Sequence, residues 1–335
     1  MLLCRDLFAE MKKNIAIVMG GDSAEKVVSL KSADVVFNHL DFEKYNVFKI
    51  LIEGMKWTCI HGQKQVPVDK SYFTIELDNK EISFDGVFIA IHGTPGEDGK
   101  LQAYFDLLRI PYNTCGQLAA ALTFDKGVCN TLLRSYGVKS AQAIYIKKNT
   151  TWDEEEIINR LGLPLIVKPN QAGSSFGINK VKEKRELRAA IDEAFQHDQQ
   201  VNIETFIVGT EVSCGVHNLN GTIEALPLTE IVSHGEFFDY TAKYEGGSEE
   251  ITPARVPEEQ AKAVQSIAVQ VFESLNLKGV CRADFIIREG EPFLIEVNTV
   301  PGLSEASIIP QQIKYRNWEL STVLSTLAEE AMART

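Results

Sequence analysis

The sequence has few of the residues that bind soft metals or cross-link a small fold. Its six cysteines stand at positions 4, 59, 115, 129, 214 and 281, and no two of them form a C-x-x-C pair. Its six histidines include no H-E-x-x-H motif and no His/Cys cluster. This pattern argues against a zinc hydrolase or a disulfide framework, and it is typical of reduced thiols in a cytosolic protein.

Long apolar runs and an excess of basic residues are also missing. No apolar stretch approaches the ~18 residues of a membrane span, and the mean hydropathy is −0.08. The start of the chain has neither the basic nor the long hydrophobic region of a signal peptide. The net charge is −12, which argues against a general nucleic-acid binder but permits a local basic pocket. We therefore expect a cytoplasmic protein that binds neither membranes nor nucleic acids.

The sequence has ample material for an α/β fold. Its 335 residues, 44% of them hydrophobic, suffice for two or three domains. An apolar run at 15–19, a Gly-Gly pair and a helical pattern over 24–40 predict the strand, turn and helix that open a doubly wound α/β domain. Residues 1–10 lack this pattern, so we expect them to be an extension before a more natural start at Met11.

The remaining elements group into two further units. The second unit begins near Thr114, and we expect its helices at 118–133 and 183–198 and its strands at 163–168 and 178–181. The third runs from about 204 to the end, with a polar, Gly-containing segment at 233–252, a helix at 258–275, a strand pair and a C-terminal helix.

Three loops are candidates for a phosphate-binding loop. The Gly20-Gly21 turn is not a G-x-G-x-x-G motif, so a simple tight turn explains it equally well. The loop at 92–101 has the wrong spacing for a P-loop, and Leu101 stands where a magnesium-binding Ser or Thr is needed. Lys168 followed by the small residues at 173–177 fits either a flap over a nucleotide or a flexible hairpin.

The strongest signal is a predicted hairpin near the C-terminus, with strands at 280–287 and 292–298. Side chains alternate between the faces of a strand, so the two strands would present polar groups on one common face. These groups are Arg282, Asp284, Glu296 and Asn298. Three oxygen donors suit magnesium better than zinc. The alternative is a solvated edge hairpin, but Leu294 and Ile295 favour a buried strand, where carboxylates need a partner or a metal.

The ordered set of motifs resembles the D-alanine:D-alanine ligase family of the ATP-grasp superfamily, over nearly the whole chain from Lys12. The motifs, in order, are Gly20-Gly21-x-Ser23-x-Glu25, Val28-Ser29-Leu30, His92-Gly93-x-x-Gly96-Glu97-Asp98-Gly99, Lys168-Pro169, Gly173-Ser174-Ser175, Asp239-Tyr240-x-x-Lys243-Tyr244, Arg282-x-Asp284 and Glu296-x-Asn298-Thr299-x-Pro301-Gly302. Each motif is weak alone, but their order is specific.

The resemblance implies a three-domain architecture and a reaction. The domains would be an N-terminal substrate-binding domain at 11–113, a central ATP-grasp domain at 114–203, and a C-terminal ATP-grasp domain at 204–335 with a mobile loop at 233–252. The family uses ATP to join two D-alanines through an acyl phosphate, for peptidoglycan precursor synthesis. The resemblance also implies ATP, two Mg2+ ions (or Mn2+) and D-alanine as ligands, and a homodimer.

The resemblance also implies a role for individual residues. Those that would contact ATP are Lys126, Lys168, Ser175, Glu204, Glu211 and Lys243. Asp284, Glu296 and Asn298 would bind the metal ions. Glu25 would hold the first D-alanine's ammonium, Arg282 would face the developing oxyanion, and Tyr244 would latch the loop through Ser174. His92, Gly302, Ser307 and Ile308 would complete the D-alanine sites.

Some positions depart from the family pattern, and alternatives remain. Lys26-Val27 stands where a His or Arg and an acid are frequent, and Thr205 where a lysine is common. Leu303-Ser304 replaces a frequent Met-Thr pair, but no core chemical group is lost. The alternatives are a D-alanine:D-lactate or D-alanine:D-serine ligase, another ATP-grasp carboxylate–amine ligase, and a nucleotide sensor. A sensor would lack the metal ligands, and the Lys243-Tyr244 pair favours D-alanine as the acceptor.

Overall fold

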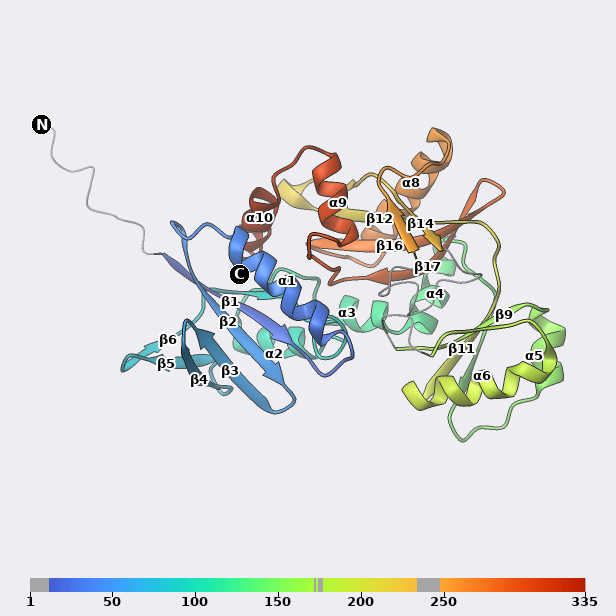
Figure 1. Ribbon diagram of the computed structural model, residues 1–335, viewed down its shortest axis with the longest axis horizontal. Helices are drawn as coiled ribbons and strands as arrows, with labels where there is room; N and C mark the ends of the chain where they lie inside the picture. The colour runs from blue at the N-terminus through green and yellow to red at the C-terminus, as the bar shows by residue number, and fades with distance from the viewer. Residues whose placement is uncertain (1–11, 172, 174–176, 234–247, 335) are drawn as a thin grey trace, which may run out of the picture.

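The computed structural model describes residues 12–171, 173, 177–233 and 248–334. The expectations for residues 1–10, Ser174, Ser175, Lys243 and Tyr244 therefore lie outside the described residues. In the described ranges the chain folds around three β-sheets. Figure 1 shows the C-terminal sheet between the N-terminal sheet on the left and the central sheet at the lower right. Over these ranges, no helix has the length and apolarity needed to cross a membrane.

The N-terminal sheet has seven strands in the order β6-β5-β4-β3-β2-β1-β7. The strands are β1 (Lys13–Gly20), β2 (Tyr45–Glu53), β3 (Lys56–His61), β4 (Lys64–Asp69), β5 (Thr74–Leu77), β6 (Lys80–Ile82) and β7 (Gly86–Ile89). β1 pairs in parallel with β2 and β7, and β2 to β6 form antiparallel hairpins. The antiparallel strands β3 to β6 extend the sheet beyond the strands that the sequence pattern predicted.

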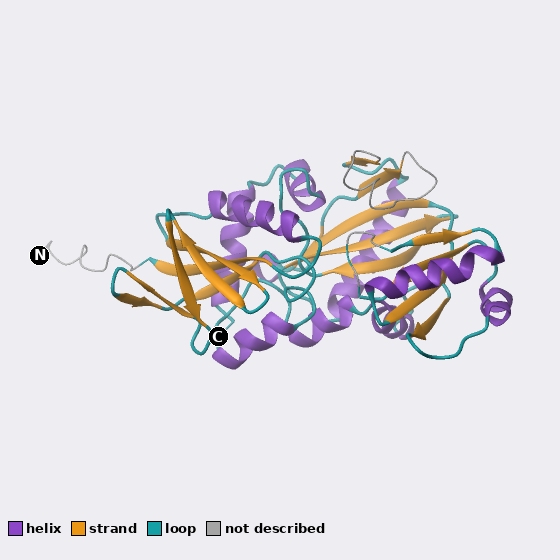
Figure 2. Cartoon of the chain, turned by 60° about the horizontal axis from the view of Figure 1, so that its bottom comes forward, coloured by secondary structure: helices purple, strands orange, loops and turns teal. Residues whose placement is uncertain are grey.

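Helices cover both faces of the parallel part of this sheet, as the doubly wound prediction requires. The side chains of β1 alternate: Ile15 and Ile17 pack with α1 (Lys26–His39) and α10 (Leu320–Met332). Ala16 and Val18 pack on the other face with α2 (Lys100–Leu108). A strand buried on both faces explains the continuous apolar run that marks it in the sequence. Figure 2 shows this sheet and its helices at one end of the molecule.

The central sheet is antiparallel, in the order β10-β9-β11-β8. Its strands are β8 (Ala143–Lys147), β9 (Leu165–Pro169), β10 (Asn179–Val181) and β11 (Gln200–Thr205), and α5 (Glu154–Leu161) and α6 (Lys184–His197) pack against it. The proposed domain boundaries after residues 113 and 203 remain a proposal, and β11 runs across the second of them.

The single helix expected over 118–133 is wrong. The segment forms two helices, α3 (Gln117–Phe124) and α4 (Lys126–Ser135), with Asp125 between them in an extended conformation. The Asp125 side chain accepts a hydrogen bond from the Val128 backbone N–H at 2.9 Å, which caps the start of α4. Lys126 therefore occupies the first turn of a helix.

The C-terminal sheet has six strands, in the order β15-β14-β12-β16-β17 with β13 paired to β12. They are β12 (Thr210–His217), β13 (Glu224–Ala225), β14 (Thr229–Ser233), β15 (Ser248–Ile251), β16 (Val280–Arg288) and β17 (Glu291–Asn298), followed by α9 (Ile308–Tyr315), with the short helix η1 at Leu219–Gly221. Strand β15 lies inside the expected mobile loop at 233–252, so the described end of that segment is a paired strand.

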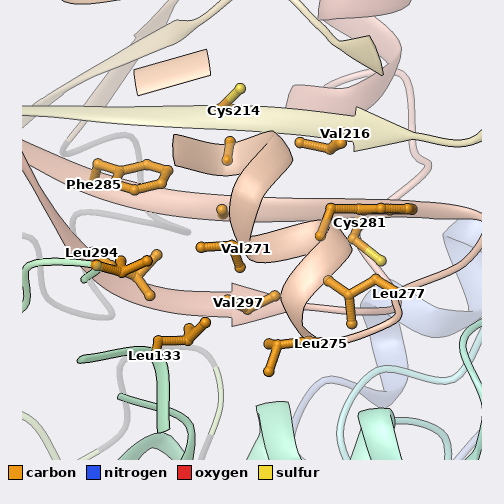
Figure 3. Packing of buried hydrophobic residues seen from close by; sticks show 14 of the residues in the cluster. Leu133, Cys214, Val216, Val271, Leu275, Leu277, Cys281, Phe285, Leu294 and Val297 are labelled. Atoms are coloured by element: carbon orange, nitrogen blue, oxygen red, sulfur yellow. The ribbon is translucent and has the colours of Figure 1, made fainter. Parts of the chain in front are cut away.

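The core of this unit lies between the C-terminal sheet and helix α8 (Glu258–Ser274). Figure 3 shows Val271 of α8 packed toward Phe285, Leu294 and Val297 of the hairpin. Because these side chains fill one face of β16 and β17, the polar side chains of the hairpin are presented on the other face. The core therefore gives the predicted polar groups a rigid support.

Candidate active site

One cavity of about 880 Å³ lies at the junction of the three sheets. All of the sequence-predicted site residues that the structure describes line this cavity. They are Glu25, His92, Lys126, Lys168, Glu204, Glu211, Arg282, Asp284, Glu296, Asn298, Gly302, Ser307 and Ile308. Residues separated by more than 280 positions in the chain thus line the same cavity.

The hairpin β16–β17 forms one wall of the cavity. Asp284 lies directly opposite Glu296, and Arg282 lies opposite Asn298. The strict alternation predicted for the return strand is wrong at Ile295, because the register shifts between Asp284 and Phe285. At this β-bulge Leu294 packs into the core, 2% exposed, although it also reaches the cavity, and Ile295 lines the cavity beside it.

Asp284 is held by two neighbours. Ser213 donates its hydroxyl to Oδ1 at 2.6 Å, and the Arg282 guanidinium binds both carboxylate oxygens, at 2.9 Å from Nε and 2.8 Å from Nη2. Burial acts to lower the pKa of Arg282, but the nearby Asp284 carboxylate outweighs it and the pKa is raised. The guanidinium is therefore a fixed positive charge at the cavity wall.

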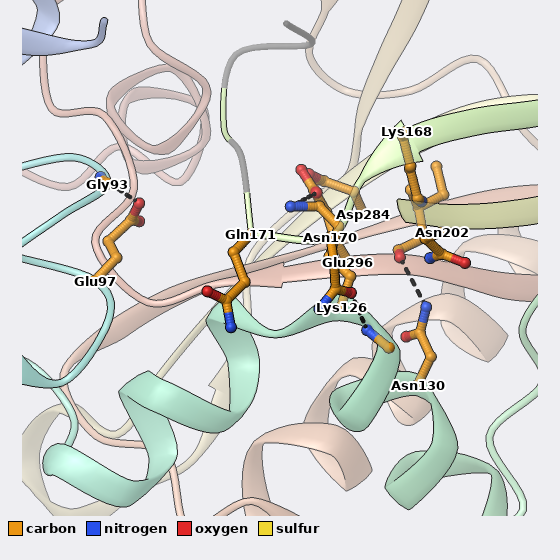
Figure 4. Close-up of polar contacts among 12 residues, drawn as sticks. Gly93, Glu97, Lys126, Asn130, Lys168, Asn170, Gln171, Asn202, Asp284 and Glu296 are labelled. Atoms are coloured by element: carbon orange, nitrogen blue, oxygen red, sulfur yellow. Dashed lines mark hydrogen bonds and ion pairs between the residues drawn. The ribbon is translucent and has the colours of Figure 1, made fainter. Parts of the chain in front are cut away.

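Two lysines from the central unit enter the cavity, each beside a carboxylate. Lys126 Nζ lies 3.3 Å from Glu296 Oε2 (Figure 4), and Lys168 Nζ lies 2.9 Å from Glu204 Oε2. Glu204 also accepts a hydrogen bond from Asn202 at 2.6 Å. Sequence reasoning missed Asn202, although Asn202 and Glu204 stand two residues apart in β11 and so face the same side.

Backbone contacts position Lys126 at the start of α4. The Lys126 backbone N–H donates to the Asn170 carbonyl at 3.4 Å, and the Gly127 N–H donates to the Asn170 side chain at 2.8 Å. Asn170 directly follows β9, which carries Lys168. Asn170 thus fixes the position of Lys126 relative to Lys168. This link between a helix start and a strand end was not found from the sequence.

The N-terminal unit contributes Glu25 and His92. His92 Nδ1 lies 2.7 Å from the Val300 carbonyl, and Nε2 lies 3.0 Å from Ser32 Oγ. A carbonyl can only accept, so Nδ1 carries the proton in the neutral ring and Ser32 donates to Nε2. Both ring nitrogens thus have protein partners, and His92 shapes the cavity wall from a fixed position.

Two glycines allow close approaches around the site. A Cβ at Gly173 would lie 2.5 Å from Glu25 Oε2, so a larger residue there would displace the Glu25 carboxylate. A Cβ at Gly302 would lie 2.7 Å from Ser307 Oγ. A side chain at Gly302 would therefore press on Ser307, which directly precedes α9, whose first residues line the cavity.

The donor set that could hold a metal contains hard oxygen ligands. Over the described ranges there is no group of three or more His, Cys, Asp and Glu side chains placed to hold a metal ion. The hairpin instead offers two carboxylates and a carboxamide, all lining the cavity. Such a set fits magnesium when substrate phosphates and water supply the remaining ligands.

The cavity combines lysines, an arginine and carboxylates between a central and a C-terminal sheet. This fold and this site define the ATP-grasp class of ligases. Family models of the D-ala D-ala ligase N-terminus and C-terminus match residues 14–115 and 132–329. The chain belongs to the D-alanine–D-alanine ligase family.

Individual relatives agree with this assignment. A D-alanine–D-alanine ligase from Parabacteroides distasonis is 45% identical, over 96% of this chain and 98% of its own length. The solved VanG D-Ala:D-Ser ligase from Enterococcus faecalis is 35% identical with a TM-score of 0.85, over 94% of this chain and 98% of that one. A Bacillus anthracis D-alanine–D-alanine ligase complexed with ATP is 27% identical with a TM-score of 0.77, over 96% and 98%.

Proposed function

We propose that this enzyme joins two D-alanine molecules into D-alanyl-D-alanine for peptidoglycan synthesis. ATP phosphorylates the donor carboxylate, the amine of the second D-alanine attacks the resulting acyl phosphate, and ADP and phosphate leave. The observation that carries this proposal is the gathering of all the described candidate residues around one cavity. The identity of the substrates is inferred from the family relationship.

The ATP site is proposed between the central and C-terminal sheets. Lys126 and Lys168 would contact the phosphates, and Ser175 and Lys243, outside the described residues, would assist them. Glu204 and Glu211 would contact adenine and ribose, the two ends of the nucleoside. The ion pair of Lys168 with Glu204 supports this arrangement, because it places a cation and a carboxylate, 5% and 10% exposed, side by side on the cavity wall.

Asp284, Glu296 and Asn298 are proposed to hold two Mg2+ ions, or Mn2+. When bound, the cations would neutralise charge on the transferring phosphoryl group. The protein's own contribution is to keep these side chains on a rigid hairpin, with Lys126 beside Glu296. The two carboxylates lie opposite each other across the strands, where like charges repel, and Arg282 and Lys126 offset this repulsion.

The proposed chemistry uses residues from all three sheets. Glu25 would bind the donor's ammonium, and Arg282 would stabilise the oxyanion that forms when the acceptor amine attacks. Gly302, Ser307 and Ile308 would seat the acceptor, next to the donor site that His92 helps to shape. Tyr244 would latch the loop through Ser174 and so exclude water from the acyl phosphate.

We also propose a cytoplasmic homodimer that binds neither nucleic acid nor membrane. The net charge of −12 supports the absence of nucleic-acid binding. Two exposed leucines on the neighbouring helices α2 and α3 support self-association. They are Leu107, 85% exposed, and Leu118, 68% exposed. Sedimentation of the chain should give twice the monomer mass.

A phosphate-release assay tests the proposed activity. Phosphate should appear with ATP, Mg2+ and D-alanine, and it should not appear with L-alanine. Excess EDTA should stop the reaction. D-Lactate and D-serine, offered with limiting D-alanine, test the acceptor alternatives. Phosphate release that is faster with D-serine or D-lactate as acceptor would replace the proposal by the corresponding ligase.

A further inference from the structure

Glu97 is a buried carboxyl group that the proposed chemistry does not use. It lies in the loop between β7 and α2 and is 8% exposed. Burial, and then the negative charge of Glu25, raise the pKa of Glu97 to about 8. Burying a carboxyl group costs free energy unless its oxygens are well bonded, so this position calls for a structural reason.

The two oxygens of Glu97 join segments that are far apart in the sequence. Oε2 accepts from the Gly93 backbone N–H at 2.7 Å, beside His92 (Figure 4). Oε1 accepts from the Val300 N–H at 3.3 Å, a contact across 203 residues. The Val300 N–H is shared with Asn298 Oδ1 at 3.2 Å. Glu97 therefore connects the His92 loop to the segment that leaves the hairpin.

Two more contacts hold the same segment. His92 binds the Val300 carbonyl at 2.7 Å, and Ser32 Oγ accepts from the Leu303 N–H at 3.2 Å. Side chains of the N-terminal unit thus bind both the N–H and the carbonyl of Val300, and also the N–H of Leu303, next to Gly302. That segment, 299–307, connects Asn298 to the first residues of α9.

We infer that Glu97 is a positioning residue for binding of the donor D-alanine: it holds the loop that carries His92 in place against the 299–307 segment. The inference rests on the proposed function. Glu97 itself does not line the cavity, whereas His92 and Gly302 do. Its effect therefore passes through backbone groups, and it concerns the D-alanine end of the cavity and not the ATP end.

The test isolates the donor half of the reaction. Hydroxylamine replaces the second D-alanine: its nitrogen attacks the acyl phosphate, phosphate leaves, and D-alanine hydroxamate is measured by its iron complex. Glu97→Gln keeps one acceptor oxygen, and Glu97→Met, of similar size, keeps none. Each net hydrogen bond lost corresponds to about a 2- to 12-fold change in an equilibrium. We expect the KM for D-alanine to rise about fivefold in Glu97→Gln and about 30-fold in Glu97→Met.

Asp98→Asn is the matched control, because the Asp98 side chain contacts Thr94, Lys100 and the Lys100 backbone within the same loop. It should leave the KM for D-alanine within twofold, and in all variants the KM for ATP should stay within twofold. An unchanged KM for D-alanine with a lower kcat, or an equal rise in Asp98→Asn, would overturn the role of Glu97. Failure of the unaltered chain to form any D-alanine hydroxamate would instead overturn the proposed function, and the inference with it.

Discussion

Replacing Arg282 by Met separates its proposed catalytic role from its structural one. The Arg282 and Asp284 side chains are only 12% and 10% exposed, so their ion pair is largely buried. Removing one partner of such a pair costs about 3–5 kcal/mol, since a buried charge is left behind. The hydroxyl of Ser213, 2.6 Å from Asp284, remains, so we expect a loss of about 3 kcal/mol. Turnover should fall at least ~10²-fold through loss of the oxyanion donor, while ATP affinity barely changes.

A second variant makes this test decisive. Arg282→Met combined with Asp284→Asn removes the unpaired charge, so urea unfolding should recover much of the lost stability while turnover stays low. Arg288→Met is the matched control on the same strand, since the Arg288 side chain is 51% exposed, and it should change little. The reasoning is refuted if Arg282→Met keeps turnover within tenfold, or if ATP binding falls while kcat is intact.

The other predictions concern single groups. Glu296→Gln should abolish turnover in a folded protein, because a neutral amide cannot replace a carboxylate that would bind Mg2+; turnover within tenfold of the unaltered chain in the phosphate-release assay would contradict the metal assignment. The pKa of Glu97 is raised to about 8 in the folded chain, from 4.5 in the unfolded one. The stability that Glu97 adds, compared with Glu97→Gln, is therefore complete below pH ~4.5 and is lost as the pH rises through about 8. The unfolding free energy of the unaltered chain minus that of Glu97→Gln should therefore decline between pH 5 and 8, and a constant difference would argue against a buried titrating carboxyl. Tyr244→Phe should slow D-alanine dimerisation about tenfold and let D-lactate compete, because loop closure loses one or two hydrogen bonds; an unchanged rate and acceptor ratio would disprove the latch.

Local patterns predicted much of this fold. Alternation placed Arg282 and Asp284 on one face of β16, and the same rule placed Glu296 and Asn298 on the matching face of β17. It failed at Ile295, because one extra residue in a bulge reverses the faces and leaves no compositional mark. The break at Asp125 did have a signal, an N-cap residue, but the apolar pattern continues through it.

Contacts between distant segments could not be predicted from a single sequence. Nothing near Glu97 indicates that its carboxyl reaches Val300, and nothing near Asn170 indicates that it aligns Lys126 with Lys168. Such contacts depend on how the sheets pack together, which no local periodicity encodes. The family resemblance identified the residues that share the cavity, but the residues that support them emerged only from the structure.

Transfer of oxygen from the donor carboxylate to phosphate tests the central claim most directly. The enzyme is given ATP and D-alanine whose carboxylate carries two 18O atoms, and the products are weighed by mass spectrometry. If ATP activates the donor as an acyl phosphate, each phosphate released carries one 18O. The dipeptide then keeps three labelled oxygens, one in the peptide carbonyl and two in the terminal carboxylate. Unlabelled phosphate, or label found in AMP, would contradict the account.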